Sequence, residues 1–428
     1  MKPLRPPFAA EVARSFLDTP GLYLHVPLCP SLCPFCPYCR VRQTPALEER
    51  FFAALRQEIA LYRAALPGPF PSLYVGGGTP SMCLDGLAPI VGELDVAGER
   101  AIEVHPMHAT TANAVRLRSM GFGHASLGVQ SFDERVLRRL QRPTTALANR
   151  QALAAFAGRF ECLDVDLIFD TAYLGADVLL ADVETAIEGG ADQVSTYPLM
   201  RFGYTPFGSG RHDRVREHAL LREVAALAAS HGWTRRSVWT FGRPDGPRYS
   251  SITREFYLGL GAGASSFTGR QLFVNHFSVE RYASKLERGE LPVARTLQLR
   301  RAGAAAYWLF WRAYAGRIDP GRFEQLFGNS LAGRGALRLA AAMGWMQREP
   351  ATLAARRTAF RLTPQGQDHY HDVEQWVTYQ FIQPLWGEMM LELDSPGSDG
   401  VARRRPAPRG AVGVLLAGAG IERETTLA

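Results

Sequence analysis

The chain has 428 residues, a length at which a single hydrophobic core usually gives way to two or more domains. Hydrophobic residues make up 46% and charged residues 21%, proportions that are typical of a globular protein and exclude a mostly disordered one. The net charge is +7, but the arginines are spread along the chain, which argues against nucleic-acid binding. No run approaches the roughly 18 apolar residues of a membrane span, and the N-terminus lacks the apolar core of a secretion signal, so a cytoplasmic protein is predicted.

Residues 1–20 are interpreted as a loose arm, and from there strands and helices alternate to about residue 231. The predicted strands cover residues 21–28, 72–80, 101–105, 124–130, 163–169 and 193–199. The predicted helices cover residues 46–66, 112–120, 133–140, 146–156, 176–188 and 215–231. Repeated strand–helix units of this size predict an α/β fold, a partial (β/α)6 barrel with parallel strands. Its functional site should lie at the C-terminal ends of the strands.

The pattern changes at about residue 296, where helical segments predict a separate C-terminal domain of winged-helix character. Four tryptophans of this region could line a substrate pocket, although their helical spacing is more typical of a core. The last residues are rich in Gly, Pro and Ala, which predicts disorder. The predicted parts are an N-terminal arm at 1–20, a barrel with an extension at 21–295, a helical domain at 296–394 and a disordered tail at 395–428.

Four of the six cysteines, Cys29, Cys33, Cys36 and Cys39, fall within eleven residues. In a reducing compartment such a cluster indicates a metal or redox site rather than disulfides. Structural zinc sites usually combine two short Cys pairs, or a pair with histidines, from separate places, and no second pair is present. The first three cysteines have the spacing C-x3-C-x2-C, and three thiolates can hold three irons of a [4Fe–4S] cluster while the fourth iron stays open.

The segments YLHVPLC (23–29), GGGTPS (76–81) and SLGVQSF (126–132) accompany this cysteine spacing. Together they resemble the HemN-like branch of the radical S-adenosylmethionine (SAM) enzymes, over residues 21–282. The resemblance implies a radical SAM barrel, a [4Fe–4S] cluster and SAM as cofactors. It also implies a small-molecule substrate and an electron donor such as flavodoxin or ferredoxin, with no nucleic acid and no membrane span among the partners.

The resemblance assigns roles to matching positions. Cys29, Cys33 and Cys36 would ligate the cluster, while Tyr23 near SAM and Glu103, paired with the SAM ammonium, are the catalytic candidates and also contact the cofactor. Glycines suit such contacts because they let backbone groups approach a ligand closely. The other expected SAM contacts are Phe35, Gly76, Gly77, Gly78, Thr79, Gln130, Arg142, Asp166, Gly261 and Ala262, of which the last two belong to a glycine turn near a second ligand pocket.

Taken singly, these residues have simpler interpretations. The GGGTP segment could be an ordinary tight turn, and Glu103 or Asp166 could be a helix cap. Cys83 and Cys162 are interpreted as packed apolar thiols. Cys39 is interpreted as a bystander, because a fourth thiolate would close the iron that SAM needs; a ligand role in the resting state is the alternative.

Three functions compete within this family. A coproporphyrinogen oxidase has an N-terminal segment rich in Tyr, Arg, Thr and Pro, and residues 1–20 show nothing like it. A haem chaperone has a His-Asn-x-x-Tyr-Trp segment before the glycine turn, and SSITREFY (250–257) lacks that histidine and asparagine. The pair Pro37–Tyr38 after the cysteines favours the C-methyltransferases and cyclopropane-forming enzymes. These use two SAM molecules to transfer a methyl or methylene group to an sp2 carbon, here of a natural-product substrate.

Overall fold

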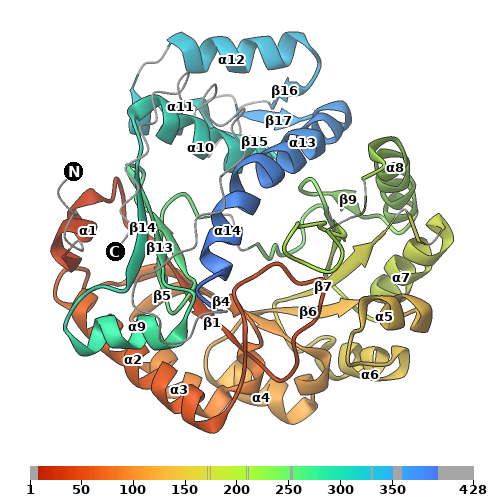
Figure 1. The fold of residues 1–428 in the computed structure, drawn as a ribbon. Coiled ribbons are helices and arrows are strands. Elements are labelled where there is room, and N and C mark those ends of the chain that lie inside the picture. Colours follow the sequence, from red (N-terminus) through yellow and green to blue (C-terminus); the bar gives the residue numbers. More distant parts are fainter. Residues whose placement is uncertain are drawn as a thin grey trace.

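A 12-stranded sheet runs through the computed structural model (Figure 1), which describes residues 8–170, 172–173, 175–208, 210, 212–250, 254–328, 331–349 and 359–393. The strand order is β14-β13-β12-β11-β1-β4-β5-β6-β7-β8-β10-β9. Six neighbouring strands pair in parallel. They are β1 (Gly21–Val26), β4 (Phe70–Gly77), β5 (Val96–Val104), β6 (His124–Gln130), β7 (Cys162–Phe169) and β8 (Gln193–Pro198). This is the predicted α/β architecture with its parallel core.

Both flanks of the parallel core carry additional strands. β11 (Tyr257–Leu260) pairs in parallel with β1, and beyond it the pairing becomes antiparallel, through β12 (Ser265–Phe267), β13 (Gln271–Asn275) and β14 (Val293–Gln298). At the other flank β10 (Thr240–Gly242) and β9 (Thr234–Arg235) are antiparallel to their neighbours. A two-stranded pair of β2 (Leu28–Cys29) and β3 (Val41–Arg42) brackets the cysteine loop.

Helices cover the outer face of the curved sheet (Figure 1). Side chains that alternate onto this face, such as Leu24, Val75 and Val165, are fully buried, because each helix places an apolar stripe on them. Capping residues fix where the helices begin: Thr44 accepts a hydrogen bond from the Leu47 amide, and Pro45 follows it. The covering helices are α2 (Pro45–Arg63), α3 (Leu84–Glu93), α4 (Thr111–Ser119), α5 (Glu134–Leu140), α6 (Ala146–Phe156), α7 (Ala176–Glu188), α8 (Arg214–Ser230) and α9 (Val279–Glu287).

The C-terminal part has the element order of a winged helix. Its elements are α10 (Arg301–Tyr314), β15 (Arg317–Ile318), α11 (Pro320–Phe327), α12 (Leu331–Ala342), β16 (Met346–Arg348) and β17 (Phe360–Leu362). The three strands form a separate sheet in the order β15-β17-β16. Beyond it, α13 (Pro364–Val377), a π-helical turn (Thr378–Ile382) and α14 (Gln383–Met390) run back across the barrel (Figure 1). We call these last three elements the cover.

Two local predictions need correction. The segment interpreted as a loose arm contains a helix, α1 (Ala9–Ser15), because Val12 is apolar enough to be buried against the core. The strand predicted at 21–28 divides into β1 and β2, because Pro27 has no amide hydrogen to donate to a ladder. The tail after 394 lies outside the described residues, and the division into parts at 295 and 296 stays a prediction. Within the described ranges, no helix is long and apolar enough to cross a membrane.

Candidate active site

The C-terminal ends of the parallel strands present a polar inner face. On β7, Asp166 and Ile168 are partly exposed while Val165 and Leu167 are buried. Glu103 on β5 and Tyr197 on β8 are partly exposed in the same way. Because neighbouring side chains on a strand point to opposite faces, solvent reaches the inner face at this end of the barrel. The predicted location of the site is therefore accessible.

The three predicted cluster ligands lie at the end of β2 and on the loop that follows it. The Cys29 thiol accepts a hydrogen bond from Thr79 Oγ1 at 3.5 Å, and the Cys33 thiol accepts one from Arg142 Nη1 at 3.2 Å. The Cys36 amide donates to the Cys33 carbonyl at 3.1 Å, which closes a tight turn. Two elements of the barrel therefore hold two of the three sulfurs in place.

The chemistry of this donor set fits an iron–sulfur cluster. Burial raises the pKa of Cys29 to about 11 and also raises that of Cys36, and the negative charges of the neighbouring thiols add to both shifts. Bound iron would offset that charge, since a coordinating thiol is deprotonated. No three His, Cys, Asp or Glu side chains among the described residues form a site for a single metal ion. Three thiols suit an iron–sulfur cluster, because each can ligate a different iron.

The Cys39 thiol is turned away from this loop. It lies 3.5 Å from the Phe277 carbonyl oxygen and packs with Val274 and Met389. A side chain at Gly263 would approach the Cys39 sulfur to 2.6 Å, so a glycine is needed at that position. The interpretation of Cys39 as a bystander agrees with this position.

The first glycine turn, at 76–78, is hydrogen-bonded to Glu103, the residue predicted to pair with the SAM ammonium group. Glu103 accepts a hydrogen bond from the Tyr74 hydroxyl at 2.5 Å and one from the Gly77 amide at 3.0 Å. Gly77 has a φ of +118°, and a Cβ at Gly76 would lie 2.7 Å from Glu103. Burial raises the pKa of Glu103, although both hydrogen bonds oppose the shift. A cation at this carboxyl would relieve the cost of its burial.

The Tyr23 hydroxyl contacts a buried histidine, His25. The hydroxyl lies 2.6 Å from His25 Nδ1, and His25 Nε2 lies 2.9 Å from the carbonyl oxygen of Cys39. Burial lowers the pKa of His25 to about 4, so the ring is neutral at neutral pH. With Nε2 protonated and donating to the carbonyl, Nδ1 accepts from the tyrosine. His25 therefore fixes the direction of the Tyr23 hydroxyl.

Gln130, Arg142 and Asp166 lie on neighbouring strands and loops of the site. Arg142 Nη2 donates to the Gly128 carbonyl at 2.7 Å, which links it to the irregular end of β6. Gln130 at that end has a φ of +69°, an uncommon conformation for a residue with a side chain. Asp166 accepts a hydrogen bond from Ser126, and burial raises its pKa.

The second glycine turn depends on Glu58, a buried carboxyl that the sequence analysis missed. Glu58 accepts from the Gly261 amide at 2.7 Å, from Asn275 at 2.8 Å and from the Tyr282 hydroxyl at 2.6 Å. Gly261 has a φ of +101°, and any side chain there would meet the backbone of His25. Ala262 next to it is buried. Glu58 lies on the buried face of a helix, where sequence alone suggests only packing.

Phe35 lies in an apolar cluster between the cysteine loop and the helices after β6 and β7. Its neighbours there include Val136, Val178 and Phe207. Ile168, near the end of β7, is partly buried and packs against the same cluster.

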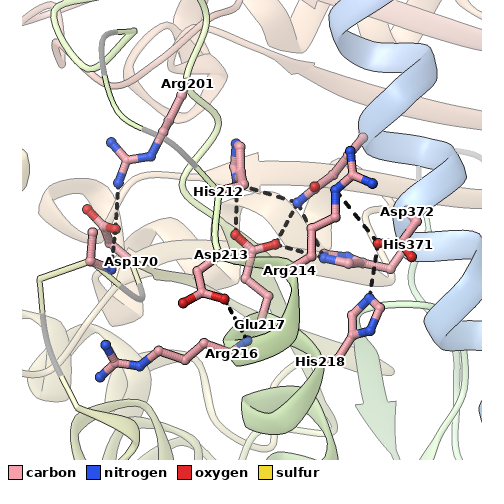
Figure 2. Close-up of polar contacts among 12 residues, drawn as sticks. Asp170, Arg201, His212, Asp213, Arg214, Arg216, Glu217, His218, His371 and Asp372 are labelled. Carbon is pink, nitrogen blue, oxygen red and sulfur yellow. Dashed lines mark hydrogen bonds and ion pairs between the residues drawn. The ribbon is translucent and has the colours of Figure 1, made fainter.

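The cover is anchored to the loop after β8 by a polar network (Figure 2). Glu217 on α8 accepts from His212 Nδ1 at 2.7 Å and from His371 Nε2 on α13 at 2.9 Å. The Tyr379 hydroxyl in the π-helical turn lies 2.6 Å from His212 Nε2 and accepts from the Arg201 amide at 2.8 Å. These contacts hold the π-helical turn of the cover against the loop after β8, at the C-terminal end of that strand.

Comparisons with known proteins identify the family. Residues 23–170 match the model of the Radical SAM superfamily. The haem chaperone HemW of Mycobacterium tuberculosis is 31% identical over 309 residues, which cover 65% of this chain and 77% of the relative. The chain belongs to the HemN-like radical SAM family. Family membership makes it a radical SAM enzyme of the HemN class and implies a [4Fe–4S] cluster and SAM.

A further relative supports this family assignment, and a solved structure shows the fold. An oxygen-independent coproporphyrinogen III oxidase of Cereibacter sphaeroides is 26% identical, covering 64% of this chain and 67% of the relative. The structure of coproporphyrinogen III oxidase (HemN) from Escherichia coli shares the fold with a TM-score of 0.70 at 20% identity. That alignment covers 87% of this chain and 93% of the oxidase.

The strand ends thus gather most of the predicted HemN-type residues in one region, although their roles in binding the cluster and SAM stay predictions. Besides Glu58, the sequence analysis missed Asp164, which is buried two residues before Asp166 on the same face of β7 and accepts from the Ser195 hydroxyl. The period of two in a strand could have revealed it. It also missed Glu374 on α13, which a helical pattern gives no reason to single out.

Proposed function

We propose that this enzyme uses two SAM molecules to transfer a methyl or methylene group to an sp2 carbon of a small unsaturated metabolite, giving C-methylation or a cyclopropane. A flavodoxin or ferredoxin is the proposed electron donor. The observation that carries the proposal is the chemistry of the inner face, which suits an unsaturated substrate that is not an anion.

Three carboxyl groups lie on that face. Glu103, Asp164 and Asp166 point inward from β5 and β7, and burial raises the pKa of each of them. The arginines that border the region are held by the protein: Arg142 by the Gly128 carbonyl and Arg201 by Asp170 at 2.6 Å. A porphyrinogen carries several propionates, which need positively charged partners, and these carboxyl groups offer none in either protonation state. This favours methyl or methylene transfer over oxidative decarboxylation.

The remaining thiols support SAM itself as the source of the transferred carbon. Cys39, Cys83 and Cys162 are each at most 3% exposed. Burial raises the pKa of all three, which disfavours the reactive thiolate. A methyl relay through a cysteine would need an accessible thiolate, so transfer through one of these three is disfavoured.

When bound, the cluster and the first SAM supply a radical that can activate the methyl group of the second SAM. Cys29, Cys33 and Cys36 would hold the cluster, and Glu103 with the first glycine turn would orient the first SAM. The turn at Gly261, fixed by Glu58, would bound the second. The cover would keep water from the reacting groups.

A haem-binding chaperone is the second candidate, because the relative with 31% identity carries that name. The absence of the expected histidine and asparagine from SSITREFY counts against it. A chaperone would bind the cluster and SAM without having to release 5′-deoxyadenosine.

The test is to reconstitute the protein anaerobically, reduce it, supply SAM with a deuterated methyl group and weigh the 5′-deoxyadenosine. Deuterium in that product is expected, since a second SAM methyl would then lie within reach of the radical. Unlabelled 5′-deoxyadenosine would favour direct attack on a substrate, as in decarboxylation. No product from a cluster-loaded protein would favour the chaperone. Cys36→Ala, which removes a predicted cluster ligand, is the negative control.

A further inference from the structure

A buried carboxyl of the cover has one oxygen without a partner. Glu374 on α13 is 7% exposed, and its Oε1 accepts a hydrogen bond from Thr378 Oγ1 at 2.8 Å. Its Oε2 is shielded from solvent and has no hydrogen-bond partner anywhere in the described part of the chain. Buried carboxyl oxygens are normally satisfied, so an unpartnered one points to a ligand.

The charge of Glu374 acts on the tyrosines of the site. Burial raises the pKa of Tyr314 on α10, and the largest charge effect on that hydroxyl comes from Glu374, ahead of those from Asp164 and Asp166. The ring of Tyr314 also contacts that of Tyr370, one helical turn before Glu374 on α13, with the ring centroids 6.0 Å apart.

Aromatic rings connect the barrel with the cover at this point. The ring centroid of Trp239 lies 5.6 Å from that of Tyr197 on β8 and 5.7 Å from that of Tyr314, and both ring pairs are T-shaped. Trp239 Nε1 donates a hydrogen bond to His371 Nδ1 at 2.9 Å. His371 lies on α13, one helical turn before Glu374. Tyr38 is 52% exposed, with its ring 5.5 Å from Trp386 of α14. We call Tyr38, Tyr197, Tyr314 and Glu374 the recognition cluster.

The composition of this cluster selects a class of substrate. Tyrosine rings favour a planar aromatic molecule, and their faces attract cations. Burial raises the pKa of Glu374 to about 7, so a bound cation would favour its ionised form, whose oxygen accepts a hydrogen bond from an N–H group and repels an anion. His371 adds no opposing charge, because its Nδ1 accepts from Trp239 and its Nε2 then donates to Glu217.

We propose that Glu374 is a specificity-determining residue, and that Oε2 receives an N–H or protonated amine of an aromatic substrate held among Tyr38, Tyr197 and Tyr314. The inference rests on the proposed function and names the substrate class of the same site, an aromatic amine or N–H heterocycle rather than a carboxylate.

The test compares two probes that share an indole ring and differ in charge, tryptamine and indole-3-propionate. Their Kd values are measured by anaerobic equilibrium dialysis with the full-length, cluster-loaded protein in the presence of SAM. We expect the wild-type protein to bind tryptamine at least about tenfold more tightly. Glu374→Gln should reduce this ratio at least about fivefold, while Glu374→Asp should retain most of it.

Glu388→Gln is the matched control, because it removes the same charge from an exposed position on α14. It should leave the ratio unchanged. The proposal is overturned if Glu374→Gln keeps the wild-type ratio, or if the wild-type protein binds both probes equally or binds neither at millimolar concentration. Dialysis involves no turnover, so its outcome is independent of the deuterium experiment. Deuterium transfer without a probe preference overturns this inference alone, and a preference without deuterium transfer overturns the methyl-transfer proposal alone.

Discussion

At the scale of single residues, the position of Cys39 separates a packing role from a role as a cluster ligand. Its thiol faces the carbonyl oxygen of Phe277 at 3.5 Å, in an apolar cluster with Met389. We expect Cys39→Ala to leave the iron content and the electron paramagnetic resonance spectrum of the reconstituted protein unchanged. The lost packing should cost about 1 kcal/mol of unfolding free energy, which urea denaturation measures.

The comparison variant is Cys36→Ala, which should lose most of the iron because it removes one of three predicted ligands. A spectrum of Cys39→Ala that differs from the wild-type spectrum would contradict the bystander interpretation and make Cys39 a ligand in the resting state. Urea denaturation measures the packing contribution of Cys39 in either case, because it does not depend on the spectrum of the cluster.

At the scale of elements, the joint between α8 and α13 depends on one ionised carboxyl (Figure 2). Burial would raise the pKa of Glu217, but hydrogen bonds from His212 and His371 outweigh burial and lower that pKa to about 2. A carboxyl whose pKa is lower in the folded state stabilises the fold above its unfolded pKa. That stabilisation is lost as the pH falls toward the folded pKa.

We expect Glu217→Gln to lower the unfolding free energy by about 3 kcal/mol at pH 7, from the shift of the Glu217 pKa. The difference between the two proteins should shrink to about half of that at pH 3, where the unfolded carboxyl is protonated. Urea unfolding of the two apoproteins at pH 7 and pH 3 measures this difference. A difference that does not change with pH would mean that the carboxylate charge does not hold the joint.

The helices and strands also show which features could be predicted from the sequence. The strand at 124–130 and the helices at 146–156 and 176–188 were predicted with the observed bounds, because local periodicity and caps determine them. Glu58 and Glu374 could not be found in this way, since each lies on the buried face of a helix and gains its meaning from distant partners. Glu58 contacts Gly261, and Glu374 lies one helical turn after Tyr370, whose ring contacts Tyr314 of α10.

At the scale of the whole molecule, the cover contacts both the cysteine loop near the start of the barrel and the loop after β8, the last strand of the parallel core. Trp386 on α14 lies 5.5 Å from Tyr38 and stacks at 6.1 Å on Phe202, which follows β8. Tyr38 is only two residues beyond the last predicted cluster ligand. A single side chain of the cover therefore connects the cysteine loop with the loop after β8.

Trp386→Ala should loosen this closure and admit oxygen to the cluster, because the variant loses both ring contacts at the mouth of the barrel. We expect the visible absorbance of the reconstituted cluster to bleach several-fold faster in air than in the wild-type protein. Trp376→Ala is the matched control, since Trp376 on α13 is 38% exposed and contacts Phe381. Its bleaching rate should equal that of the wild-type protein. Equal rates for all three proteins would mean that oxygen reaches the cluster by a route that the cover does not close.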